Sequence, residues 1–219
     1  MTTLVAALAL VAACSDESGD DEGLGGGSGD GPDGAALVEP FETEAEAAYE
    51  ANDGDRLDDF NRGTTIDDGC FALDEAGAVA VTEALALDGA GDAGIADGTF
   101  LQGPPGQGET LSCGIDAGED ARIGVTVGTT TLERDQLLEQ MELGAGQSDQ
   151  ELTEIDGEAP GLDADTVLAV DRDGFATFGW IDGDFTVALS FPEDLADYDR
   201  GFEALPVLVG AVADTLTGG

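Results

Sequence analysis

Residues 166–191 read TVLAVDRDGFATFGWIDGDFTVALSF, and this stretch predicts a meander of three antiparallel strands. Its last third alternates apolar and polar residues, so one face of an extended chain is apolar. The apolar positions there are Phe185, Val187, Leu189 and Phe191. Asp173-Gly174 and Asp182-Gly183 suit the two-residue turns of tight hairpins. We therefore expect strands near 166–171, 175–181 and 184–191.

Two more strands are expected upstream of the meander. The residues around Cys113 can extend, and ARIGVTVG at 121–128 alternates apolar with small or polar residues. The glycine- and proline-rich segment 88–108 is expected to be loop. Capping residues and apolar residues at helical spacing indicate helices over 43–51, 74–88, 130–143 and 205–216. The expected fold class is α+β, in which an antiparallel sheet of about five strands has its helices packed on one face.

Phe178 and Trp180 alternate along the middle strand of the meander and allow two interpretations. They fill the core beneath the helices, or they form an exposed aromatic binding face if that side of the sheet is open. The sequence favours the core and leaves the binding face as an alternative.

The composition is strongly acidic. The chain of 219 residues carries 49 Asp and Glu against 6 cations, all of them arginine, and its formal net charge is −43. Such a surface repels phosphates, so nucleic acid is excluded as a direct partner. It is typical of a salt-adapted protein, since salt screens the mutual repulsion of carboxylates over roughly 3 Å at 1 M. A role in cation binding is the alternative explanation.

The N-terminus, MTTLVAALALVAACSDESGDD, turns from apolar to acidic at Cys14. The apolar run is too short to span a bilayer and fits a signal-peptide core, although no cation precedes it. Val11-Ala12-Ala13-Cys14 resembles the lipobox of bacterial lipoproteins, which implies that Cys14 carries a diacylglyceryl group after cleavage. We expect a signal peptide at 1–13, a flexible acidic Gly-rich tether at 14–36 and a single domain at 37–219. The alternative is a buried helix with an incidental Cys14.

Cys70 and Cys113 remain once Cys14 is lipidated. Outside the cytoplasm, an even number of cysteines favours a disulfide. A redox or zinc pair is the alternative, but the chain has no CxxC spacing and no histidine.

A family resemblance appears around these cysteines. Cys70 followed by Leu73, a small-residue helix ending in Leu87-Asp88-Gly89, and a strand opened by the second cysteine are similar to a family of small actinobacterial lipoproteins of unknown function. The resemblance covers about residues 68–217. Where that family commonly has Trp two residues after the second cysteine, this chain has Ile115. The resemblance implies a fold and a location and implies no activity.

Few catalytic chemistries are open to this chain. Without histidine or lysine it cannot build a Ser-His, Cys-His or Ser-Lys system, which leaves only paired carboxylates.

A calcium site is suggested by the Asp-x-Asp-Gly sequence that begins at Asp171. The sequence does not fit an EF-hand loop, because Ala176 is at the position that needs glycine and Asp182 is at the position that needs glutamate. We expect solvated acids at a hairpin turn there, as at the acidic cluster of Asp53, Asp55, Asp58 and Asp59. No catalytic residue, metal ligand or cofactor is assigned.

These features favour a binding or interaction module on the extracytoplasmic face of the cell membrane, anchored in membrane lipid through acylated Cys14. Its expected partner is an envelope protein or a small ligand, and nucleic acid is not expected. The alternatives are an accessory lipoprotein of an envelope complex and, less favoured, a carboxylate-based hydrolase. The protein is expected not to be an enzyme.

Overall fold

The protein is described by a computed structural model over residues 31–51, 64–66, 70–87, 90–102, 108–118, 122–147 and 150–218. These residues form an antiparallel sheet of eight strands in the order β1-β2-β3-β4-β8-β7-β6-β5. The strands are β1 (Thr64–Ile66), β2 (Gly94–Gln102), β3 (Glu109–Asp116), β4 (Arg122–Thr129), β5 (Leu152–Glu154), β6 (Val167–Arg172), β7 (Phe175–Asp182) and β8 (Phe185–Pro192).

The α+β class and the antiparallel sheet are confirmed, but the expected number of about five strands is too small. The five expected strands are β3, β4, β6, β7 and β8. The sheet gains β1, β2 and β5 at its edges, and β1 and β5 are only three residues long. The longest of them, β2, has the sequence GIADGTFLQ and lies in the segment expected to be loop. Its register shifts between Ala96 and Thr99, as a β-bulge requires, and this irregularity obscures the alternation of side chains.

Four α-helices accompany the sheet: α1 (Ala35–Ala51), α2 (Glu75–Ala84), α3 (Arg134–Gln147) and α4 (Tyr198–Thr217). Two short 3-10 helices, η1 (Ala90–Asp92) and η2 (Ala164–Thr166), lie in the connections. Asp74 caps α2 as expected, because its Oδ1 accepts a hydrogen bond from the Gly77 N–H at 2.7 Å.

The first helix begins earlier than the sequence predicts. It starts at Ala35, inside the segment 14–36 expected to be a tether, and it contains Pro40. Thr43 is therefore not an N-cap, and its hydroxyl donates instead to the Glu39 carbonyl at 2.8 Å. The chain just before the helix is attached to the sheet, since the Gly34 N–H donates to Asp182 Oδ2 at 2.8 Å. The domain thus starts a few residues before position 37, whereas residues 1–30 lie outside the described residues.

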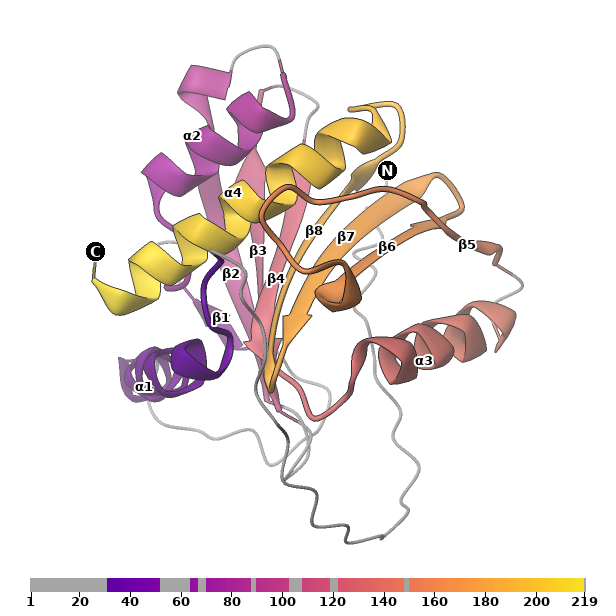
Figure 1. Ribbon diagram of the computed structural model, residues 1–219. Helices are drawn as coiled ribbons and strands as arrows, with labels where there is room; N and C mark the ends of the chain where they lie inside the picture. The colour runs from indigo at the N-terminus through magenta and orange to yellow at the C-terminus, as the bar shows by residue number, and fades with distance from the viewer. Residues whose placement is uncertain are drawn as a thin grey trace, which may run out of the picture.

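The main core lies between one face of the sheet and the helices α1, α2 and α4. Figure 1 shows α4 crossing the sheet between α1 and α2. The apolar side chains of β8 that share one face, Phe185, Val187, Leu189 and Phe191, are all fully buried there, as the alternation predicts.

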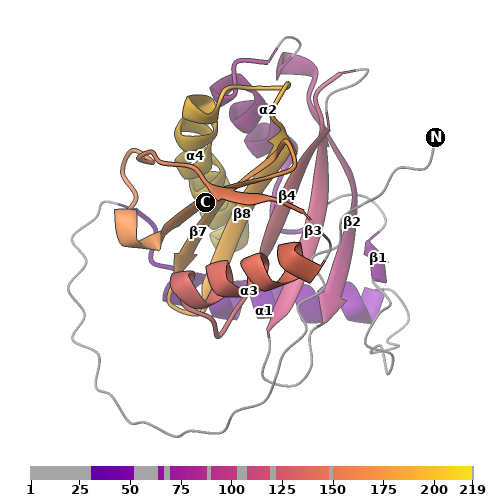
Figure 2. The same ribbon diagram turned by 90° about the vertical axis from the view of Figure 1, so that its right-hand side faces the viewer.

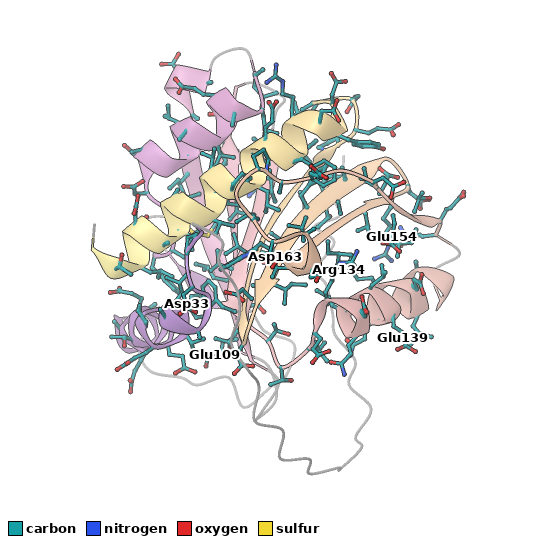
Figure 3. The ribbon with its side chains drawn as sticks, viewed as in Figure 1. Asp33, Glu109, Arg134, Glu139, Glu154 and Asp163 are labelled. Atoms are coloured by element: carbon teal, nitrogen blue, oxygen red, sulfur yellow. A yellow bond between two sulfur atoms is a disulfide. The ribbon has the colours of Figure 1, made fainter. Side chains whose placement is uncertain are left out.

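Helix α3 packs on the opposite face, so the expectation that all helices share one face is wrong. Along β6, alternate residues belong to two different clusters, with Val167 and Ala169 in the main core. Leu168 and Val170 form a second cluster with Ile181, and residues of α3 cover it. Figure 2 shows α3 lying away from α2 and α4. Arg134 fixes the start of α3 by donating to the Val167 carbonyl at 2.7 Å and pairing with Glu154 at 3.3 Å (Figure 3).

Close packing of α4 on the sheet depends on a glycine at position 201. A Cβ atom at Gly201 would overlap the ring of Phe178, which is fully buried and cannot move aside. The Phe178 ring also contacts Phe202 edge-on, with ring centroids 5.0 Å apart, and stacks on Phe191 at 5.5 Å. Glycine therefore sets the distance between helix and sheet.

We expect Gly201→Ala to lower the free energy of unfolding by about 1–3 kcal/mol, because the core must shift to admit a methyl group. Gly210→Ala on the same helix is the matched control, since a Cβ there meets no atom within 4 Å. This control should raise stability by up to about 1 kcal/mol through helix propensity. Equilibrium urea unfolding measures both variants, and equal effects would show that the Phe178 contact does not set the packing distance.

Candidate functional site

The two cysteines of the domain form a disulfide, as expected. Cys70 and Cys113 are bonded, with their Cα atoms 5.9 Å apart. Cys70 lies just before α2 and Cys113 in the middle of β3, so the bond ties the start of the helix to the sheet. Cys14, the expected lipidation site, lies outside the described residues.

The aromatic binding face considered from the sequence is not exposed. Phe178 is 0% and Trp180 is 2% solvent-exposed, and both belong to the main core. The alternation along β7 directs these even-numbered side chains toward α4, while the odd-numbered ones point to the other side of the sheet. A binding face built on Phe178 and Trp180 is therefore wrong, and the interpretation as core is correct.

Beyond the area that α3 covers at Ile181, the other side of the sheet has half-buried residues on all four middle strands, and we call this part the open face. Its central residues on β3, β4, β7 and β8 are small or carry hydroxyl groups. They are Ser112, Gly124, Thr126, Thr177, Ala188 and Ser190. A Cβ atom built at Gly124 or at Gly179 would meet only atoms of the neighbouring strands, at 3.6 Å or more. Both positions therefore have room for a Cβ atom, although Gly179 is buried and Gly124 is half-buried.

The hydroxyl groups of this face are available for hydrogen bonding. Thr177 and Ser190 stand opposite each other on β7 and β8, and their hydroxyl oxygens are 3.0 Å apart. A hydroxyl group has one donor and two acceptor positions, so this pair retains free capacity toward solvent or a ligand.

Three residues at one end of the open face were not predicted from the sequence. Arg122 begins β4, whereas Arg172 and Phe175 flank the turn between β6 and β7. Phe175 is 43% exposed, although Ala176 beside it is fully buried. The alternation of the meander and the scarcity of arginine in this chain are the signals that could have found them.

The acidic run that begins at Asp171 stabilises a hairpin. Asp171 Oδ1 accepts from the Gly174 N–H at 3.0 Å, and its Oδ2 accepts from the Tyr198 hydroxyl at 3.1 Å. Partial burial and the neighbouring carboxylates of Asp171 and Glu193 raise the pKa of the Tyr198 hydroxyl above its ordinary value of 10.0. Tyr198 therefore remains a hydrogen-bond donor at neutral pH. Asp173 in the turn is exposed, as expected of a solvated acid, whereas Asp171 is half-buried and bonds the turn.

The described residues form neither a metal cluster nor a membrane-spanning helix. Among them, no group of three or more Asp, Glu, His or Cys side chains could hold a metal ion. The acidic cluster Asp53, Asp55, Asp58 and Asp59 lies outside the described residues. None of the described helices is both long and apolar enough to cross a membrane.

Comparisons with protein-family models, curated proteins and solved structures find no match to the chain.

Loss of the disulfide should destabilise the fold substantially. The cysteines are 43 residues apart, and opening a loop of that size costs about 4 kcal/mol in the chain-entropy description. We expect the free energy of unfolding of the double variant Cys70→Ala/Cys113→Ala, measured in urea, to be lower than that of the oxidised wild type by that amount. Adding reductant should destabilise the wild-type protein and leave the double variant unchanged. A double variant as stable as the oxidised wild type would show that the bond contributes nothing to stability.

Proposed function

We propose that the protein is a lipid-anchored, extracytoplasmic binding module of the cell envelope and that the open face is its binding surface. The observation that carries this proposal is the open face itself. Beyond the part that α3 covers at Leu168, Val170 and Ile181, it is a sheet surface of small and hydroxyl-bearing residues. The other sheet face is buried completely enough to leave Phe178 and Leu189 without exposure. The proposed role involves no catalytic step.

The location is supported by the cysteines. Disulfides persist in oxidising compartments, and Cys70 and Cys113 are bonded. The lipobox-like residues that end at Cys14 are followed by an acidic, glycine-rich segment, which is the composition of a tether. An acylated Cys14 would therefore place an oxidised domain outside the membrane.

The attachment point of the N-terminal segment supports an accessible open face. Gly34 is bonded to Asp182, at the turn between β7 and β8. Arg122 on β4, Arg172 on β6 and Phe175 on β7 lie at the other end of the sheet, the end away from the β7–β8 turn. A strand of eight residues is about 25 Å long, so a membrane tether leaving near Asp182 would not crowd that end of the face.

The accessory-lipoprotein alternative has less support. A stable structural interface requires a contiguous apolar surface. Among the described residues, the exposed large hydrophobic side chains are Leu143 on α3 and Phe175 on β7. They lie on different elements and do not indicate such a patch.

The anchor is tested in a bacterium that processes lipoproteins, by feeding cells an alkyne-bearing fatty acid. The wild-type protein should incorporate the label and sediment with the membranes. Cys14→Ser should lose the label and leave the membrane fraction, because it lacks the sulfur to which the lipid is attached. Ser15→Ala is the matched control and should behave as wild type. The proposal would be refuted by a wild-type protein that carries no label and whose measured mass is that of the uncleaved chain starting at Met1.

A further inference from the structure

The open face differs in charge from the rest of this acidic protein. On β3, β4, β7 and β8, the alternation of side chains places only two charged residues on it, Asp116 and Arg122, both at one end. The chain as a whole has 49 acidic residues. An anionic ligand is therefore repelled less on this face than on an average part of the protein surface.

Two arginines at this end of the face have no ion pair with any acid that the structure describes. In the parts of the chain that the structure describes, ion pairs are formed by Arg134 and Arg200 and not by Arg122 or Arg172. Asp116 stands opposite Arg122 in the register, yet the guanidinium group lies over Gly114 instead. A Cβ atom at Gly114 would be 2.8 Å from Arg122 Nε, so only glycine permits this position.

Arg172 carries a second, independent sign of a missing partner. Its Nε is buried and has no hydrogen-bond partner within the described structure. A buried donor without an acceptor costs free energy, and a hydrogen bond to a charged acceptor is among the stronger ones. The exposed ring of Phe175 is its neighbour across the Asp173-Gly174 turn. Arg172 as a whole is half-buried, so an anionic group at its guanidinium would compensate the charge even though Nε itself is out of the reach of solvent.

The spacing of the arginines favours a chain-like ligand over a small ion. The strands β4 and β6, which carry Arg122 and Arg172, are separated by β8 and β7. Three strand spacings place the two backbone positions about 14 Å apart. Because the Arg122 side chain lies toward β3 and Gly114, away from β6, one small anion cannot meet both groups. A polymer that runs across the strands can.

The surface between the arginines matches a sugar chain. Small residues give a flat floor, the Thr177 and Ser190 hydroxyls offer hydrogen bonds, and Phe175 offers a ring on which a sugar can stack. A net charge of −43 repels densely charged polymers, which leaves a ligand whose anionic groups are sparse.

We propose that the open face binds an extended glycan in which uncharged sugars alternate with carboxylated ones, and that Arg122 and Arg172 each receive a carboxylate. This inference rests on the proposed function, since it names the ligand class of the same face. Guanidinium groups bind carboxylates through paired hydrogen bonds, and the sugars between the carboxylates lie on the small-residue floor.

The test is calorimetric titration of the full-length protein in mild detergent with three probes at constant ionic strength. Hyaluronan hexasaccharide has a carboxylate on every second sugar, chitohexaose has none, and polyglutamate has carboxylates without sugars. The hyaluronan hexasaccharide should bind most tightly. Arg122→Gln and Arg172→Gln should each weaken it about tenfold, the loss of one charge-assisted interaction. Arg200→Gln, which removes the same charge from α4, should leave binding unchanged.

A second pair of variants tests the floor of the face without touching the arginines. Gly124 has room for a side chain, because a Cβ there is in ordinary contact with Ser190. Gly124→Glu should abolish hyaluronan binding through charge repulsion, whereas Gly124→Gln, of the same size, should retain more of it. Circular dichroism confirms that both variants are folded.

Four outcomes would overturn the inference. Equal binding of chitohexaose and hyaluronan in all variants would remove the role of the arginines. Tighter binding of polyglutamate would indicate an acidic peptide partner, and concentration-dependent dimers in sedimentation that block the probes would indicate a second copy on the face. If no probe binds while Cys14 is acylated in cells, the ligand class is wrong and the lipoprotein proposal stands. If Cys14 is not acylated, the lipoprotein proposal fails. Glycan binding is then judged only by the titrations of the Arg122, Arg172 and Gly124 variants.

Discussion

The packing of α4 on the middle strands of the sheet is the contact on which the rest of the structure depends. Gly201 lets the helix approach until the Phe178 ring lies against it, and Phe202 and Phe191 complete the aromatic cluster. This contact assigns the side chains of Ala176, Phe178 and Trp180 on β7 to the core. Because side chains alternate along a strand, it also assigns the odd-numbered ones to the opposite face. The open face is thus a consequence of the way in which α4 is seated.

The acidity of the chain makes the composition of that face informative. With 49 acidic residues against 6 arginines, an average part of the surface carries an excess of carboxylates. Over the middle strands the open face instead presents hydroxyl groups, glycine and alanine, with arginine at one end. A surface intended only for solvation would carry acids there as elsewhere. The disulfide between Cys70 and Cys113 ties the strand that carries Ser112 and Gly114 to α2, which limits movement of the face.

Much of the fold could be predicted from local pattern. The meander was predicted because Asp-Gly turns separate alternating runs, and the Asp74 cap was predicted because a short acidic side chain precedes an apolar helix. The edge strands were not predicted, since β2 contains two glycines and a bulge and owes its strand form to pairing with β3. Pro40 concealed the true start of α1 at Ala35.

The candidate site was predictable only in part. Pairing of Cys70 with Cys113 follows from the expectation that Cys14 is lipidated, which leaves two cysteines, and from the missing zinc ligands. Which face of β7 is covered does not follow from the strand, because Phe178 and Phe175 both lie on alternating positions of one aromatic-rich segment. That choice is made by α4 and Gly201, far away in the sequence. The buried Nε of Arg172 and the placement of Arg122 over Gly114 also depend on strand register, which one sequence does not specify.

The accessibility of the open face is tested most directly by thiol labelling of two matched variants in a Cys14→Ser background, with the native disulfide oxidised. Ala188→Cys places a thiol on the open face, and Ala204→Cys places one on α4, where the alanine is fully buried. Iodoacetamide should modify the thiol at position 188 in the folded protein and should modify the one at position 204 only after denaturation. Equal protection of both thiols in the folded protein would show that the sheet is covered on both sides and would contradict an open binding face.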